Sequence, residues 1–141
     1  MPGNASVKNT LLIDTGPIAA LMNRRDRHHQ RATELFRDFP GAMMTTWPVL
    51  TEASHLLPDH LRVGLMRWVA AGALAIHEMP ASAAEEIADL MEKYNDRPMD
   101  LADASLVWLG SHCGVIQIAT IDLDDFSVYR THKNRNFTNM F

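Results

Sequence analysis

The sequence has one cysteine, few aromatic residues and no excess of positive charge among its 141 residues. Because Cys113 alone cannot form an internal disulfide, the fold must depend on a packed core, as in reduced cytosolic proteins. Lys and Arg number 13 against 17 Asp and Glu, which gives a net charge of -4. This balance excludes a polycation that coats nucleic acid, so any such binding must be local. A content of 47% apolar and 21% charged residues also excludes a disordered chain.

The sequence also lacks a hydrophobic run suited to secretion or membrane insertion. Residues 1–10 are polar, and the apolar run that follows stops at Asp14, too short for a signal-peptide core. The stretch from Ala104 to Ile121 carries no formal charge and approaches spanning length. However, Gly110-Ser111-His112-Cys113-Gly114 indicates a helix end and a turn within it. We therefore expect a cytoplasmic protein without membrane association: one domain over residues 1–141, with its core from about residue 11 and a polar segment at 1–10.

Short apolar segments alternate with helical patterns along the chain and predict an α/β fold. The expected strands are Leu11–Ile13, Ala42–Thr45, Ala73–Met79 and Val115–Thr120, with a short edge strand around Phe137–Phe141. A helix is expected from about Trp47, with the apolar stripe Val49, Leu50, Ala53, Leu56 and Leu57. The capping-box spacing Ser82-Ala83-Ala84-Glu85 predicts the start of another helix. One or two helices between successive strands imply a mainly parallel sheet covered on both faces, without internal repeats.

Two aspartates follow predicted strands, at the edge where parallel sheets open their ligand crevice. Asp14 comes directly after the first strand, and Asp122 follows the strand that ends at Thr120. Each aspartate alone is better explained as a helix cap or an Asx turn. Their coincidence at the ends of two strands favours a functional role.

A predicted helix that begins near Asp100 carries two further carboxylates. Asp100 and Asp103 share one face because they are three residues apart, and Asp100 is also a natural N-cap. Asp103 lies among apolar residues, which suggests partial burial without a Lys or Arg on the same helix. Glu52 lies at the border of the apolar stripe of the helix after the second strand, where a solvated flank position explains it as well.

Together, Asp14, Glu52, Asp103 and Asp122 would place four carboxylates at one edge of the sheet. Clustered carboxylates resist ionisation unless cations neutralise them, and oxygen ligands favour Mg²⁺ or Mn²⁺. Such ions can activate water for in-line hydrolysis of a phosphodiester. Thr120 and Thr15 could support a carboxylate or a bound water by hydrogen bonding.

Four segments in order resemble the PIN domain family, in particular VapC-type toxins of toxin–antitoxin pairs. They are Leu11-Leu12-Ile13-Asp14-Thr15-Gly16-Pro17-Ile18, Thr51-Glu52-Ala53, Leu101-Ala102-Asp103-Ala104-Ser105-Leu106 and Ile118-Ala119-Thr120-Ile121-Asp122-Leu123-Asp124-Asp125-Phe126. The resemblance implies a three-layer α/β/α sandwich and metal-dependent endoribonuclease activity. It assigns Asp14, Glu52, Asp103 and Asp122 to an acidic quartet that binds Mg²⁺ or Mn²⁺, with Asp100 as an auxiliary ligand. It also implies an RNA substrate, a homodimer and a cognate antitoxin, although a stand-alone nuclease would have the same fold.

Basic residues near the expected site are candidates for contacts with RNA phosphates. Beyond Asp125 the chain contains Arg130, Lys133 and Arg135 and no acid, and Arg97 lies just ahead of the Asp100 helix. A second group, Arg24, Arg25, Arg27 and Arg31, surrounds Asp26. Taken singly, each of these residues is better explained as a solvated residue of a surface or tail. Because few aromatic residues lie among these charges, a base-stacking platform is not indicated.

Three other functions remain open from the sequence. Asp14-Thr15-Gly16 is also the aspartic-protease signature, but that chemistry needs two such aspartates on an all-β fold. A phospho-acceptor signalling domain would need an acidic pair after the first strand and an acceptor Asp after the third, where this chain has Glu78-Met79-Pro80. A catalytically inactive PIN-fold binding module is the third alternative, and the presence of all four acids argues against it.

Overall fold

A five-stranded parallel sheet forms the centre of the protein in a computed structural model that describes residues 9–141. The strands are β1 (Thr10–Ile13), β2 (Ala42–Thr45), β3 (Ala75–Ile76), β4 (Gln117–Ala119) and β5 (Thr138–Asn139). Their order is β3-β2-β1-β4-β5, and every pairing in the sheet is parallel. The predicted polar segment covers residues 1–10. Residues 1–8 of it lie outside the described part of the chain, and its last residue, Thr10, begins β1.

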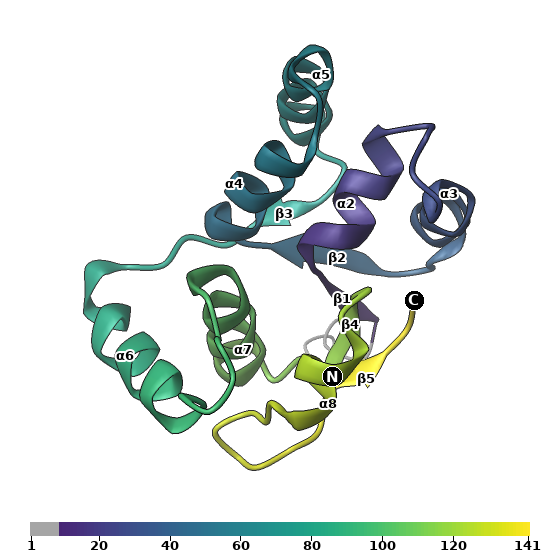
Figure 1. Ribbon diagram of the computed structural model, residues 1–141. Coiled ribbons are helices and arrows are strands. Elements are labelled where there is room, and N and C mark those ends of the chain that lie inside the picture. The colour runs from purple at the N-terminus through teal and green to yellow at the C-terminus, as the bar shows by residue number, and fades with distance from the viewer. Residues whose placement is uncertain (1–8) are drawn as a thin grey trace.

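Helices flank this sheet. They are α2 (Thr15–Met22), α3 (His29–Asp38), α4 (Trp47–Leu56), α5 (Asp59–Ala70), α6 (Ala84–Lys93), α7 (Leu101–Cys113) and the short α8 (Leu123–Val128), with a 3₁₀ turn at Ala81–Ala83. In Figure 1, α2 to α5 lie above the sheet in the view, and α6 and α7 lie below it. The predicted α/β/α arrangement is therefore confirmed.

The core is built where the central strand meets the most apolar helix. Leu11, Leu12 and Ile13 of β1 have no exposed surface, as expected for a strand with a neighbour on each edge and helices on both faces. Helix α7 is buried from Ala104 to Gly110. A Cβ atom at Gly110 would lie 2.7 Å from the Val115 carbonyl oxygen, so a glycine is needed for this helix to pack so closely.

The strand order reverses beside β1, and this reversal positions the site. From β1 the chain moves outward to β2 and β3, then crosses to β4 on the other side of β1 and continues to β5. The crevice at such a reversal lies beyond the carboxyl ends of the two adjacent strands. In this protein β1 is followed by Asp14, as predicted, whereas β4 ends at Ala119, one residue earlier than predicted, so Thr120 follows it and Asp122 comes two residues later.

Several local predictions were wrong in detail. The third strand is limited to Ala75–Ile76, and α7 continues to Cys113 before Gly114 ends it with a φ of 68°. The predicted capping box is absent, because Ser82 lies in the 3₁₀ turn and α6 starts at Ala84 without a side-chain cap. Leu56 is 62% exposed, whereas Leu57, which follows α4 in an extended conformation, is buried.

Across residues 9–141, no helix has both the length and the apolar content needed to cross a bilayer.

Candidate metal centre

Asp14 is the most deeply buried carboxylate of the site, with 6% of its surface exposed. Its Oδ1 accepts a hydrogen bond from the Thr15 backbone N–H at 2.8 Å, which caps α2. Its Oδ2 accepts one from the Thr120 hydroxyl at 2.7 Å. Burial raises the pKa of Asp14; the two hydrogen bonds oppose this effect, while the charges of Asp100 and Asp122 add to it. The capping and functional interpretations are therefore compatible for this residue.

Thr120 joins the two strand ends. While its hydroxyl donates to Asp14, its Oγ1 accepts from the Asp122 backbone N–H at 3.0 Å. Asp122 in turn caps α8 by accepting from the Asp125 N–H at 3.2 Å. Its side chain remains exposed, and its pKa is raised by partial desolvation and by the neighbouring carboxylates.

The start of α7 supplies the other two aspartates. Asp100 is the N-cap, because its Oδ1 accepts from the Asp103 backbone N–H at 2.8 Å. Asp103 is half-buried, and its Oδ2 accepts from the hydroxyl of the buried Tyr129 at 3.3 Å. Desolvation and the charges of surrounding aspartates, Asp100 first among them, raise the pKa of Asp103 to about 7. The same burial and negative charge raise the pKa of the Tyr129 phenol, which keeps it a hydrogen-bond donor.

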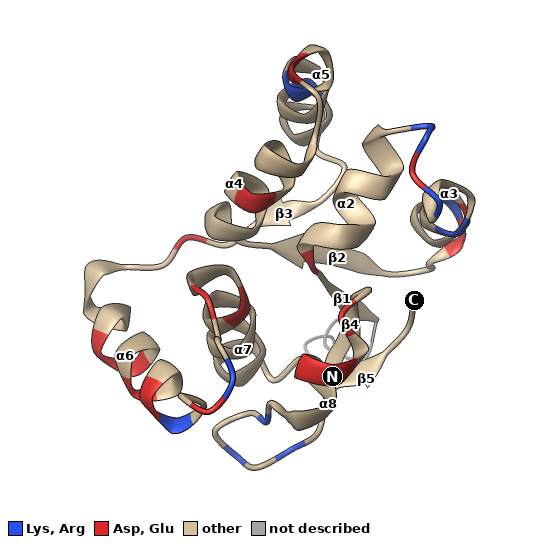
Figure 2. Cartoon of the chain, in the orientation of Figure 1, with Lys and Arg blue, Asp and Glu red and all other residues tan. Residues whose placement is uncertain are grey.

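Mutual repulsion shows that these carboxylates converge. The charges of Asp100 and Asp122 raise the pKa of Asp14. The charges of Asp100, Asp14, Asp125 and Asp122 raise the pKa of Asp103. Figure 2 shows acidic segments at the ends of β1 and β4 and along α7 and α8, on elements from distant parts of the chain. We call Asp14, Asp100, Asp103, Asp122 and Asp125 the acidic cluster.

One member of the acidic cluster is already neutralised. Asp125 accepts from Arg97 Nη1 at 2.8 Å, and both side chains are only partly exposed. The guanidinium of Arg97, which was predicted to contact an RNA phosphate, therefore already has an internal partner. Sequence reasoning did not assign a role to Asp125 or Tyr129. The acidic run Asp124-Asp125 just after Asp122 was a usable signal for the first, whereas nothing local marked Tyr129 as a partner of Asp103.

Glu52 is the predicted site residue that the structure does not bring into close interaction with the others. It is exposed on the second turn of α4, and it is not among the charges with the largest effects on Asp14 or Asp103. Its role in the quartet therefore stays a prediction.

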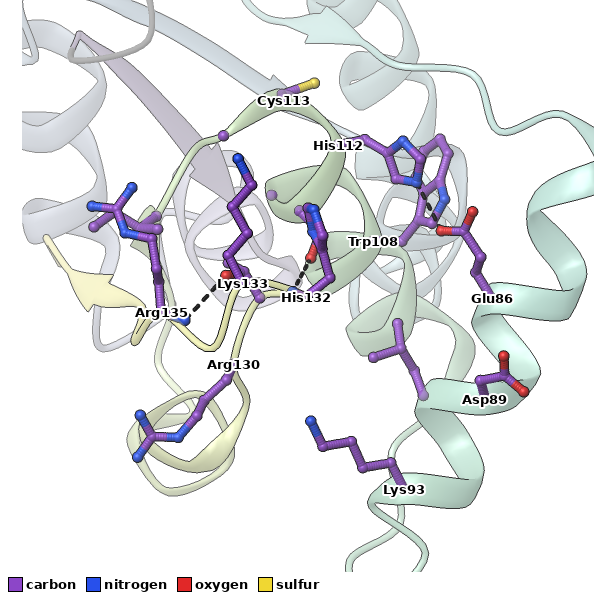
Figure 3. Close-up of a pocket in the computed structure, with 16 residues that line it drawn as sticks. Glu86, Asp89, Lys93, Trp108, His112, Cys113, Arg130, His132, Lys133 and Arg135 are labelled. Carbon is purple, nitrogen blue, oxygen red and sulfur yellow. Dashed lines mark hydrogen bonds and ion pairs between the residues drawn. The ribbon is translucent and has the colours of Figure 1, made fainter.

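The other predicted basic residues lie away from the acidic cluster. Arg130, Lys133 and Arg135 line a pocket beside the far end of α7 (Figure 3). Arg24, Arg25 and Arg27 are exposed between α2 and α3, and Arg31 lies over the Phe141 ring, 4.5 Å from its centroid.

The donor chemistry fits a hard divalent cation, although the side chains do not yet surround one point. Carboxylate oxygens from four aspartates repel one another without a lysine or arginine between them, which is the arrangement that Mg²⁺ or Mn²⁺ relieves. Within residues 9–141, no group of three or more His, Cys, Asp or Glu side chains is spaced for metal binding. Metal binding would therefore require these carboxylates to rearrange.

The central parallel sheet with helices on both faces defines the class of this protein as a three-layer α/β/α domain with acids beyond its middle strands. In particular, the chain is similar to two VapC proteins. The chain is 26% identical over 132 residues to "Ribonuclease VapC26" of Mycobacterium tuberculosis (strain ATCC 25618 / H37Rv), covering 91% of this chain and 98% of that protein. Its fold matches the crystal structure of Mycobacterium tuberculosis VapC20, described as a "Sarcin-Ricin loop cleaving toxin", with a TM-score of 0.74 and 23% identity over 81% of this chain and 91% of that one. No family model matches the sequence. The resemblance predicted from four short segments is thus confirmed as homology to VapC-type ribonucleases.

Proposed function

We propose that this protein is a metal-dependent endoribonuclease that hydrolyses RNA phosphodiester bonds with Mg²⁺ or Mn²⁺. The observation that carries the proposal is the convergence of Asp14, Asp100, Asp103 and Asp122 at the reversal point of the sheet, where burial and the neighbouring carboxylates raise the pKa of Asp14 and of Asp103. The homology to ribonuclease VapC26 supports the same reaction, and the match to VapC20 supports the same fold.

In this proposal Asp14, Asp103 and Asp122 hold the metal, Glu52 completes the set, and Asp100 is auxiliary. A bound divalent ion would activate a water molecule and stabilise the charge that develops on the phosphate oxygens. Thr120 fixes the Asp14 carboxylate through its hydroxyl, and Tyr129 holds Asp103 in the same way. Because the Asp103 pKa is about 7, its proton must leave before it can act as a ligand. Metal affinity is therefore expected to increase with pH.

The test compares RNA cleavage by the unmodified protein with cleavage by Asp14→Asn and Asp103→Asn, each with Mn²⁺ and with EDTA. The expected result is cleavage only by the unmodified protein in the presence of metal. Glu92→Gln removes one carboxylate from the exposed face of α6 and is the matched control, expected to cleave normally. Equal cleavage by all four proteins would refute the metal site.

The biological setting follows from the homology and belongs to the same proposal. We extend it to a toxin of a toxin–antitoxin pair, acting in the cytoplasm as a homodimer and inhibited by a cognate antitoxin. Co-expression with the neighbouring open reading frame tests the inhibition: growth arrest on expression of this chain alone, relieved by that neighbour, is expected.

The alternatives predict different chemistry. A phospho-acceptor domain would be labelled by acetyl phosphate, and an inactive PIN-fold module would bind RNA without cleaving it. Homology to ribonuclease VapC26 over 91% of the chain favours the nuclease over both.

A further inference from the structure

A second site lies at the opposite end of α7 from the acidic cluster. A pocket of about 840 Å³ is enclosed by α6, the end of α7 and the loop over residues 130–135 (Figure 3). This volume is within the usual range for small-ligand sites, roughly 300–1,000 Å³. Helix α7 has 13 residues, so its two ends are about 18 Å apart. The pocket is therefore separate from the reacting centre but within reach of a nucleic acid bound there.

Positive charge predominates in this pocket. Lys93, Arg130, Lys133 and Arg135 line it, against the carboxylates of Glu86 and Asp89. The Glu86 carboxylate is already paired with His112, whose Nε2 lies 2.7 Å from Glu86 Oε2. None of the four cations takes part in an ion pair within the described part of the chain. The pocket is thus suited to an anion, in a molecule whose net charge is negative.

Flat rings stand beside these cations. The ring of Trp108 lies 4.6 Å from that of His112, and His112 lies 6.4 Å from His132, with tilts of 37° and 34°. Trp108 is nearly buried, whereas both histidines are exposed at the pocket. Imidazole rings are among the side chains on which unpaired RNA bases stack. The sequence did not indicate this stacking platform, because His112 and His132 are twenty positions apart in the chain.

The loop that carries the cations is held in place before any ligand binds. Thr131 is buried, and its Oγ1 accepts from the Arg135 N–H at 3.2 Å, while its backbone N–H donates to the Arg135 carbonyl at 3.0 Å. The His132 N–H donates to Ser111 Oγ at 3.0 Å, which ties the loop to α7. Asn134 adopts the left-handed conformation with a φ of 59°, which asparagine tolerates better than most residues. A preorganised loop loses little entropy when it binds.

The same chain segment leads from this loop to the acidic cluster. Tyr129 donates to Asp103, and the next residue, Arg130, lines the pocket. Because Tyr129 is fully buried, an RNA strand whose reacting phosphate lies at the acidic cluster would reach the pocket over Arg130, which is partly exposed.

We propose that this pocket is a subsite for a single-stranded RNA nucleotide outside the cleaved bond, with its phosphates held by Arg130, Lys133 and Arg135 and its base stacked on His132 and His112. The inference rests on the proposed nuclease function and adds a determinant of substrate length and selectivity. It predicts that the pocket contributes to binding of long RNA and makes no contribution to hydrolysis of a small phosphodiester.

The test uses two variants that leave the acidic cluster intact: the double variant Lys133→Glu/Arg135→Glu and the single variant His132→Ala. The control is Arg67→Glu, an exposed arginine on α5. Binding of a fluorescent 12-nucleotide single-stranded RNA is measured by anisotropy in EDTA. We expect Kd to rise about tenfold or more for the double variant because phosphate contacts are lost, and about fivefold for His132→Ala because a stacked base is lost. The control is expected to stay within about twofold of the unmodified protein.

Kinetics then separate the subsite from the reaction. With Mn²⁺, KM for the same RNA should rise in both pocket variants while hydrolysis of bis(p-nitrophenyl) phosphate stays unchanged. If the unmodified protein cleaves RNA but the pocket variants bind and cleave it normally, the subsite is refuted and the nuclease stands. If nothing is cleaved but the variants still weaken RNA binding, the nuclease is refuted and the subsite stands as an RNA site. Equal competition by inorganic polyphosphate and by RNA would also refute the subsite, because no base would then be recognised.

Discussion

Replacing Asp103 by asparagine should make the metal-free protein more stable while abolishing cleavage. Asn keeps an oxygen that can accept the Tyr129 hydroxyl but removes a charge that burial and four neighbouring aspartates disfavour. The pKa of Asp103 is about 7 in the folded protein against an ordinary value of 3.8, and each pH unit of difference corresponds to about 1.4 kcal/mol. The upper limit is therefore about 4 kcal/mol. Since Asp103 is only half-buried and water screens its charge, we expect about 1–2 kcal/mol.

The sign of the pH dependence follows from this raised pKa. Between pH 4 and pH 7 the folded protein keeps the Asp103 proton that the unfolded chain has lost, so this group lowers stability as pH rises. The advantage of Asp103→Asn over the unmodified protein should therefore be absent near pH 3.5, grow from pH 4 to pH 7, and level off above.

Urea denaturation in EDTA at pH 4, 6 and 8 measures this difference, with Glu92→Gln as a control that removes the same charge from an exposed helix. The expected free energy of unfolding at pH 8 is higher for Asp103→Asn and unchanged for Glu92→Gln. If the free energy of unfolding of Asp103→Asn at pH 8 is equal to or lower than that of the unmodified protein, the argument that the carboxylates of the acidic cluster repel one another is refuted.

Three further predictions concern the same region. Millimolar Mn²⁺ should raise the melting temperature of the unmodified protein but not of Asp103→Asn, because only the intact acidic cluster gains a ligand. Scanning calorimetry with Mn²⁺ and with Ca²⁺ measures the melting temperature, and an unmodified protein whose melting temperature does not rise would contradict the prediction. Thr120→Val removes the donor to Asp14 and the acceptor for the Asp122 N–H; metal affinity should fall about 10–100-fold, as for other groups that orient ligands, and titration calorimetry measures it. Gly110→Ala places a Cβ against the Val115 carbonyl and should lower the free energy of unfolding by about 1–3 kcal/mol; denaturation at the same stability as the unmodified protein would contradict the packing argument.

The order of elements was predictable because it depends on local patterns. The run Leu11-Leu12-Ile13 lies between turn signals, is too short for a helix and is apolar throughout. These features predict a buried strand, and the structure confirms it as the central strand. The capping box at Ser82–Glu85 was wrong because a 3₁₀ turn replaced the first helical turn, a choice that local spacing does not determine. The lengths of β3 and β4 were overestimated for a similar reason: apolar residues continue beyond the point where backbone pairing ends.

Asp100 and Asp103 show how far the site could be predicted. Their spacing placed them on one face, and the apolar neighbours indicated the partial burial of Asp103, which the structure confirms. Spacing could not show that Arg97 pairs with Asp125, or that Tyr129 donates to Asp103, since these contacts join residues 26 to 28 positions apart.

The sequence by itself determined the strand and helix pattern, the acids that follow the strands, and the excess of basic residues after Asp125, because each is expressed within a few neighbouring positions. Only the tertiary structure decided which charges meet. The reversal of strand order beside β1 joins Asp14 to Thr120 and brings the aspartates of α7 to the same edge, whereas it leaves Glu52 on the surface of α4. The packing of residues 130–135 against α7 likewise places Arg130, Lys133 and Arg135 around a separate pocket. Such encounters depend on chain topology, since burial and repulsion act through space between residues that the sequence holds far apart.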